Sequence, residues 1–229
     1  MKLGERPLIA LPLDDINFDK NLNLAKEKNI DIIEVRVDQF SSLETDYVVE
    51  HFKKAKDKGF YTIATVRSEK EGGKNISDDK RIEIFEAVAT YADILDIELT
   101  SEEINSKVIQ IAKSEGILSL VSYHDFDKTP TEIEIQKIIT QAYNLEANII
   151  KYAFKANSIE DVGRVLSMTH RNRDKNLVAI SMGELGKVSR VTGFFFGSLI
   201  TYTFIGKSFA PGQIEADKLI EELKFYNLL

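Results

Sequence analysis

The chain has 229 residues, of which 43% are hydrophobic and 29% charged, and it carries a net charge of −7. A chain of this length buries a substantial core without cross-links, and its lack of cysteine excludes a disulfide scaffold, a thiol nucleophile and a cysteine-ligated metal. The acidic balance disfavours nucleic acid or an anionic membrane as a partner, because both require a positive field.

Short runs rich in β-branched and aromatic residues predict eight strands. They are Leu8–Leu13, Ile32–Val37, Tyr61–Arg67, Ile94–Leu99, Ile117–His124, Asn148–Phe154, Leu177–Met182 and Leu199–Phe204. The segments between them predict amphipathic helices, with start signals at Thr129-Pro-Thr-Glu and Asn157-Ser-Ile-Glu. This alternation, without a linker or a low-complexity tract, predicts one α/β domain over residues 1–229, a single (β/α)8 TIM barrel. A doubly wound open sheet is the alternative.

The two ends of the chain bear on localisation. The N-terminal MKLGERPLIALPL lacks the long apolar core and the small-residue cleavage site of a secretory signal. The most apolar tail segment, Gly193–Gly206, is shorter than the ~18 residues that span a bilayer, and we expect it to be buried core. Together with the absence of cysteine, these features predict a cytoplasmic protein with no membrane partner.

Charged residues alternate with bulky apolar ones inside three of the predicted strands. In a parallel barrel the apolar set must face the surrounding helices, so we expect the charged set to point into the barrel. That set comprises Glu34, Arg36, Asp96, Glu98 and Lys151. Buried charges cost several kcal/mol each unless they are paired or functional. The pattern therefore indicates either an internal ion-pair network or a site at the carboxyl ends of the strands.

Lys151 and His124 are the strongest candidates for chemistry. Lys151 lies in the middle of an apolar strand, where desolvation and nearby cations are expected to lower its pKa. A neutral amine is what imine formation with a ketone or an aldehyde requires. His124 ends the preceding strand and suits a general acid–base within reach of the same small substrate. His51, in a lysine-rich helical segment, and His170, in a polar run, are predicted to be exposed.

Loops after the strands supply further polar groups. Arg67 leaves the third strand, and Glu71 follows on a loop made pliable by two glycines, from which it can reach and orient a histidine. Arg190 follows the seventh strand, and its planar fork suits a carboxylate. The sequence contains no metal-ligand spacing, no nucleophile elbow and no dinucleotide fingerprint.

The chain resembles the type I 3-dehydroquinate dehydratases of the shikimate pathway, nearly end to end. The stretches that carry the resemblance are Glu34-Val-Arg-Val-Asp38, Arg67-Ser-Glu-Lys-Glu71-Gly-Gly, Asp96-Ile-Glu-Leu, Ser122-Tyr-His-Asp, Ile150-Lys-Tyr-Ala, Met182-Gly, Ser189-Arg and Ala210-Pro-Gly-Gln213. The resemblance implies a homodimeric lyase that dehydrates 3-dehydroquinate to 3-dehydroshikimate through a Schiff base, by syn elimination, with no metal or organic cofactor.

The resemblance also implies roles for single residues. Lys151 would form the Schiff base with the ring ketone. His124 would remove the proton beside the imine and then protonate the departing hydroxyl, while Glu71 would hold His124 in place. Arg190 would pair with the ring carboxylate. The remaining contacts to the carboxylate or the ring hydroxyls are implied for Glu34, Arg36, Arg67 and Gln213, and the Gln213 loop would act as a lid.

Three features depart from the family's pattern. Phe209 stands where many members have a serine, Leu11-Pro12 ends strand one where a small polar residue is common, and the extended N-terminal hairpin of longer relatives is lacking. Two other functions stay open. A lysine-dependent aldolase acting on a sugar phosphate would need phosphate loops that are weak here, and a non-enzymatic binding barrel would need a purely structural charged interior.

Overall fold

The strands close into a barrel. The computed structural model describes residues 2–229, and its parallel sheet has the order β7-β6-β5-β4-β3-β2-β1-β8, with β9 beside β8. The strands are β1 (Leu8–Leu13), β2 (Ile32–Arg36), β3 (Tyr61–Thr65), β4 (Ile94–Glu98), β5 (Leu118–Asp125), β6 (Ile149–Lys155), β7 (Leu177–Met182), β8 (Ile200–Phe204) and β9 (Ile214–Glu215). The backbone N–H of Leu199 donates to the Leu177 carbonyl at 2.8 Å and joins the β8 edge to β7.

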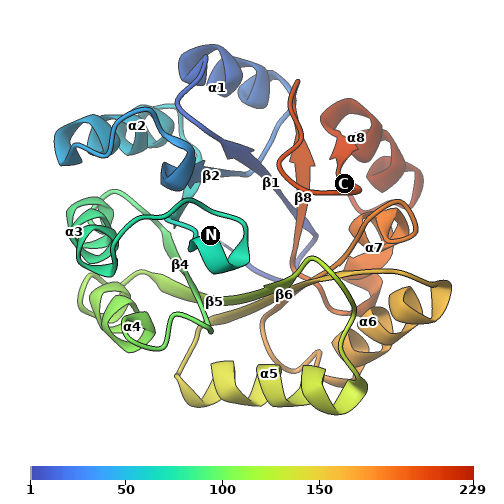
Figure 1. Cartoon of the computed structure of the whole chain (residues 1–229). Coiled ribbons are helices and arrows are strands. Elements are labelled where there is room, and N and C mark those ends of the chain that lie inside the picture. The colour runs from blue at the N-terminus through green and yellow to red at the C-terminus, as the bar shows by residue number, and fades with distance from the viewer. Residues whose placement is uncertain (1) are drawn as a thin grey trace.

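The helices alternate with the strands and form a ring around them (Figure 1). They are α1 (Phe18–Glu27), α2 (Thr45–Asp57), α3 (Asp78–Val88), α4 (Asn105–Ser114), α5 (Glu132–Asn144), α6 (Ile159–Arg171), α7 (Lys187–Thr192) and α8 (Ala216–Phe225). Capping boxes at Thr131 and Ser158 begin α5 and α6, as the sequence signals predict. The predicted (β/α)8 barrel is thus confirmed, and no strand precedes β1 within residues 2–229.

Apolar side chains form two separate layers. The larger layer fills the space between the strands and the helices and includes Ile33 and Leu95. The smaller layer lies inside the barrel and includes Ile32 and Ile94 at the amino ends of their strands. Because side chains alternate along a strand, the charged residues two and four positions after Ile32 and Ile94 share this inner face. The inward orientation predicted from the alternation is therefore correct.

One prediction of exposure, at His51, and one of burial, at Gly193–Gly206, are wrong. His51 is only 6% exposed, because it belongs to the apolar stripe of α2, where its ring packs against Phe18 and Phe40 and its Nδ1 lies 2.8 Å from the Tyr47 carbonyl. The segment Gly193–Gly206 is buried only in part, since Phe195 is 55% exposed. Within residues 2–229 no helix is long and apolar enough to cross a membrane.

Candidate active site

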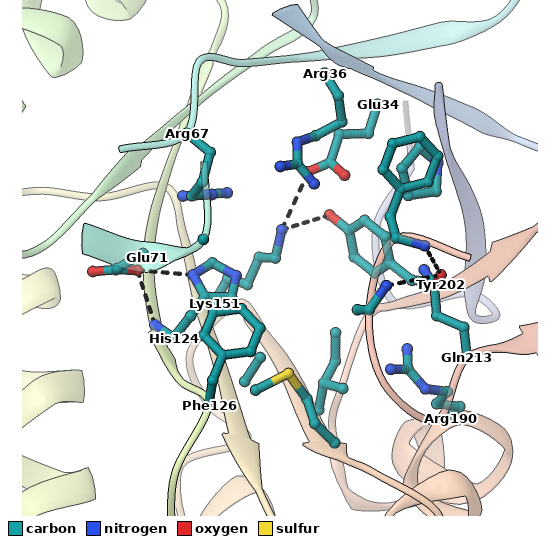
Figure 2. Close-up of a pocket in the computed structure, with 17 residues that line it drawn as sticks. Glu34, Arg36, Arg67, Glu71, His124, Phe126, Lys151, Arg190, Tyr202 and Gln213 are labelled. Atoms are coloured by element: carbon teal, nitrogen blue, oxygen red, sulfur yellow. Dashed lines mark hydrogen bonds and ion pairs between the residues drawn. The ribbon is translucent and has the colours of Figure 1, made fainter. Parts of the chain in front are cut away.

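A cavity of about 190 Å³ opens at the carboxyl ends of the strands (Figure 2). Strands contribute the side chains at its base, and the loops that follow the strands contribute those at its rim. All the residues that the sequence analysis assigns to the site line this cavity, namely Glu34, Arg36, Arg67, Glu71, His124, Lys151, Arg190 and Gln213. The fold therefore brings together groups that are spread over most of the chain.

Lys151 lies on β6 and is 4% exposed. Its Nζ donates to Asp96 Oδ2 at 3.1 Å, to Glu34 Oε1 at 3.3 Å and to the Tyr202 hydroxyl at 3.1 Å. Burial by itself would lower the pKa of Lys151, but the Asp96 and Glu34 carboxylates outweigh burial and raise that pKa above its ordinary value. The predicted lowering of this pKa is thus wrong, because the nearest charges, supplied by β4 and β2, are negative.

Glu71 and His124 form a hydrogen-bonded pair beside Lys151 (Figure 2). Glu71 Oε2 accepts from His124 Nδ1 at 2.8 Å and from the His124 backbone N–H at 2.9 Å. The ionised form of Glu71 only accepts hydrogen bonds, so beside it Nδ1 of His124 carries the ring proton and Nε2 is the free base. Burial, together with the Arg67 and Lys151 cations, lowers the pKa of His124 well below its usual value, so the ring is neutral. Burial raises the pKa of Glu71 to about 7.

An ion-pair network supports the base of the cavity. The Arg67 guanidinium donates to Asp96 Oδ2 at 2.7 Å, to Glu98 Oε1 at 2.9 Å and to Ser122 Oγ at 2.6 Å. Glu98 also pairs with Arg81 of α3. Burial would raise the pKa of Asp96, but Arg67 and Lys151 hold it well below its usual range. Part of the charged interior is therefore structural, and it fixes the carboxylate that faces Lys151.

Two of the three residues that depart from the family's pattern, Phe209 and Pro12, line the cavity. Arg36 forms a bidentate pair with Asp38, with nitrogen–oxygen distances of 2.9 and 2.8 Å. The ring of Phe209 covers this guanidinium, whose central carbon is 5.7 Å from the ring centroid. Pro12 lines the cavity, whereas Leu11 packs toward the helices. Phe209 and Pro12 thus present apolar surface to the cavity.

Arg190, from α7, is the cation of the site without a carboxylate partner among residues 2–229. It is 3% exposed, its Nη2 donates to the Pro211 carbonyl at 3.1 Å, and its buried Nε has no partner in the described part of the chain. Burial lowers the pKa of Arg190 to about 10, so it remains charged at neutral pH. A buried, unneutralised guanidinium favours an anion, above all a planar carboxylate.

The loop between β8 and β9 covers one side of the cavity. Gln213 Oε1 accepts from the Phe209 backbone N–H at 2.8 Å, which folds the loop on itself. The Gly183 backbone N–H donates to the Pro211 carbonyl at 3.2 Å and holds the loop against the end of β7. Gly212 has a φ of +71°, and a Cβ there would stand 2.2 Å from the Gly183 carbonyl oxygen. Only glycine permits this close seating of the loop.

Two aromatic lining residues were not assigned to the site from the sequence. Tyr202 of β8 places its hydroxyl against Lys151, as described above, and the ring of Phe126 stacks parallel to the His124 ring at 6.3 Å between centroids. A signal for Tyr202 exists, because it shares its strand parity with the inward-facing Ile200. Phe126 follows β5 in a loop, and nothing in its sequence surroundings marks it.

The arrangement is suited to reactions at a carbonyl group of a small anion. An amine, a neutral imidazole fixed by a carboxylate, and an unpaired guanidinium face one cavity, with Ile180 and Met182 as apolar walls. No group of three or more His, Asp or Glu side chains within residues 2–229 is placed to hold a metal ion.

Comparison with known proteins identifies the family. The sequence model of the type I 3-dehydroquinase family matches residues 10–229. The chain is 44% identical to the 3-dehydroquinate dehydratase of Aquifex aeolicus, over 96% of this chain and 100% of the relative. It is 36% identical to that of Methanococcus maripaludis, over 96% and 100%.

Solved structures agree with the sequence comparisons. The crystal structure of the Aquifex aeolicus enzyme superposes with a TM-score of 0.89 at 43% identity, covering 97% of this chain and 100% of the other. The type I enzyme of Clostridium difficile, solved with covalently modified comenic acid, superposes with a TM-score of 0.92 at 29% identity, over 99% and 95%. The chain therefore belongs to the type I 3-dehydroquinate dehydratases, enzymes of the shikimate pathway.

Proposed function

We propose that residues 1–229 form one catalytic domain that converts 3-dehydroquinate to 3-dehydroshikimate through a Schiff base on Lys151, with no metal or organic cofactor. The observation that carries the proposal is the position of the Lys151 amine, in one cavity with the Glu71–His124 pair and the unpaired Arg190. The covalently modified ligand of the Clostridium difficile relative supports covalent chemistry in this family.

The first step joins Lys151 to the ring ketone. Because the carboxylates around Nζ stabilise the ammonium, the lysine must lose a proton before it attacks, and the neutral Nε2 of His124 is a nearby acceptor. The amine nitrogen then bonds to the ketone carbon. The ketone oxygen leaves as water with one hydrogen from that nitrogen and the proton that His124 had accepted, which returns His124 to its neutral form. The resulting iminium withdraws electrons from the adjacent carbon.

The second step eliminates the hydroxyl. His124 Nε2 removes a proton from the carbon beside the iminium, and the electron pair of that bond moves toward the nitrogen. As the electrons return, the neighbouring carbon–oxygen bond breaks, and the hydroxyl takes the proton from His124 and departs as water. One residue on one face of the ring acts as base and then as acid, so the elimination is syn. Hydrolysis of the imine releases the product and restores Lys151.

Different polar residues of the cavity are proposed to bind different groups of the substrate. We assign the ring carboxylate to Arg190 and the ring hydroxyls to Glu34, Arg36 and Gln213. The loop that carries Gln213 would close over the substrate and exclude water. The donors of Arg67 are engaged by Asp96, Glu98 and Ser122, so we propose that Arg67 acts mainly by fixing Asp96 and by its positive field.

Replacement of Arg190 tests the carboxylate site. We expect Arg190→Met to raise KM for 3-dehydroquinate by about 10- to 100-fold, because charged hydrogen bonds contribute ~1.5–3 kcal/mol. The melting temperature should not fall, since the variant removes a buried charge that has no carboxylate partner among residues 2–229. Steady-state kinetics and thermal unfolding measure the two effects. An unchanged KM would place the carboxylate elsewhere in the cavity.

The pH dependence of catalysis tests the Glu71–His124 pair. The active form has an ionised Glu71, whose pKa is raised to about 7, so kcat/KM should be high above pH 7 and fall as pH decreases through that value. In Glu71→Gln this group no longer titrates, and the remaining acid limb should move to the lower pKa of His124. The measurement is kcat/KM against pH for the wild type and for Glu71→Gln. Circular dichroism at each pH shows that both proteins remain folded. A limb near pH 7 that persists in Glu71→Gln contradicts the assignment.

The activity itself has a direct test. Addition of 3-dehydroquinate should produce the ultraviolet absorbance of the conjugated product, and borohydride should trap an adduct that peptide mass spectrometry locates on Lys151. Product formation without any adduct would reject the imine mechanism, but it would still support the assignment of dehydratase activity. A sugar phosphate under the same trapping conditions serves as the comparison for an aldolase.

We further propose that the enzyme is a cytoplasmic homodimer. Three aromatic side chains, Phe195, Phe225 and Tyr226, are exposed and touch one another in one cluster. Exposed apolar clusters of this kind favour a protein contact, and sedimentation of the full chain measures whether two copies associate. A chain without cysteine suits a reducing compartment.

A further inference from the structure

Tyr202 is a buried residue of β8 to which the proposed mechanism gives no role. It is 4% exposed and lines the cavity. Its hydroxyl lies 3.1 Å from Lys151 Nζ, and the centroid of its ring lies 4.5 Å from the same nitrogen. Figure 2 shows the ring reaching across the cavity toward the lysine. The side chain is thus placed against the reacting atom of the proposed imine chemistry.

The hydrogen of this hydroxyl is available to a ligand. An ammonium group has only hydrogens to give, so the Tyr202 oxygen accepts from Lys151 and its own hydrogen points elsewhere. Among residues 2–229, Lys151 is the one hydrogen-bond partner of this hydroxyl. The other two groups on Nζ, Glu34 and Asp96, are carboxylates that accept from it. Tyr202 therefore brings a free hydrogen-bond donor next to Nζ, on the cavity lining.

We propose that Tyr202 is a catalytic residue of imine formation, which passes a proton between Lys151 Nζ and the ketone oxygen of the substrate. This inference rests on the proposed function. As the nitrogen–carbon bond forms, the π electrons of the carbonyl move onto oxygen. The oxygen takes the phenolic hydrogen, and the phenol regains one from the nitrogen that has become positive. The products are a neutral carbinolamine and an unchanged tyrosine, so atoms and charge balance.

The surroundings suit a relay that stays protonated between turnovers. Burial raises the pKa of Tyr202, more than the Lys151 cation lowers it, so no stable phenolate accumulates. The assignment also separates two duties. His124, held by Glu71 at the end of β5, deprotonates the lysine before attack and serves the elimination, whereas Tyr202 from β8 serves the carbonyl oxygen.

The variant Tyr202→Phe removes the hydroxyl and keeps the ring. We expect the rate of borohydride-trapped adduct formation with 3-dehydroquinate to fall about 10- to 100-fold. KM should change less than about threefold, because Arg190 and the other rim residues that bind the substrate are retained. The trapped fraction during turnover should also fall, since the imine then forms slowly and is consumed at its ordinary rate. Rapid quench with borohydride and mass spectrometry measures each quantity.

Tyr152→Phe is the matched control. Tyr152 is a fully buried residue of β6 next to Lys151, but it faces the helices, where its hydroxyl lies 2.7 Å from Thr169 Oγ1. The Tyr152→Phe variant loses a tyrosine hydroxyl, as Tyr202→Phe does, but from outside the cavity. It should form adduct at the wild-type rate. A wild-type rate in Tyr202→Phe, or an equal loss in both variants, overturns the role of Tyr202 alone. A wild-type enzyme that makes product without adduct overturns the imine mechanism as well.

Discussion

Lys151→Ala is expected to abolish the borohydride-stable adduct and to lower kcat for 3-dehydroquinate by at least about 10⁴-fold, as is typical when a catalytic nucleophile is lost. The reason is that no other amine lines the cavity among the described residues, so the iminium that withdraws electrons has no alternative origin. Product absorbance measures turnover, and intact-protein mass spectrometry measures the adduct. Retention of either by a folded Lys151→Ala would reject this lysine as the nucleophile.

Stability must be measured beside activity in this variant. Removal of Nζ takes a partner from two buried carboxylates, Glu34 and Asp96, and an uncompensated buried charge costs ~3–5 kcal/mol. Asp96 keeps Arg67, and Glu34 keeps a hydrogen bond from Thr65, so the cost should lie toward the lower end. Thermal unfolding shows whether the variant is folded. Lys155→Ala, at the end of the same strand and outside the cavity lining, should keep both adduct and turnover.

His124→Ala should separate the two steps of the reaction. We expect a trapped imine to form, more slowly than in the wild type, while product formation falls by about 10²–10⁴-fold, the usual contribution of a general acid–base. The physical reason is that the iminium still activates the adjacent carbon, but no group at the end of β5 removes its proton. Because the imine is no longer consumed, the fraction of enzyme trapped by borohydride at steady state should rise.

His170→Ala provides the control for this substitution. His170 is exposed on α6, lies beside Arg173 and is not among the residues that line the cavity, so its loss should leave adduct and turnover unchanged. Normal product formation by His124→Ala would remove the histidine from its assigned role. A loss of adduct equal to the loss of product would instead assign His124 mainly to imine formation.

The barrel and its inward charges were predictable because they depend on local periodicity. Ile33 and Val35 alternate with Glu34 and Arg36, and a parallel strand enclosed by helices has only one way to bury the first pair. Strand ends were less predictable. The third strand ends at Thr65, before Arg67, where its neighbour β2 also ends, since Thr65 is paired with Arg36, the last residue of β2.

The prediction that His51 is exposed was wrong because it relied on composition, whereas the strand predictions were right because they relied on residue spacing. The segment around it is rich in lysine, which suggests exposure, but α2 places His51 on the same face as Val48 and Phe52. Average composition conceals this stripe, whereas helical spacing reveals it. Tyr202 was missed for a different reason. Its parity marks it as inward, but its contact with Lys151 depends on the closure of the barrel between β8 and β1.

The sequence alone determined the order of the strands and the face on which each strand charge lies, since these follow from side-chain alternation and parallel connections. Only the tertiary structure decided the charge states. Lys151 and Glu34 are 117 residues apart in the chain, and their contact at 3.3 Å helps reverse the expected direction of the lysine pKa. Electrostatic energy depends on distance and burial, and neither quantity is defined until the barrel closes.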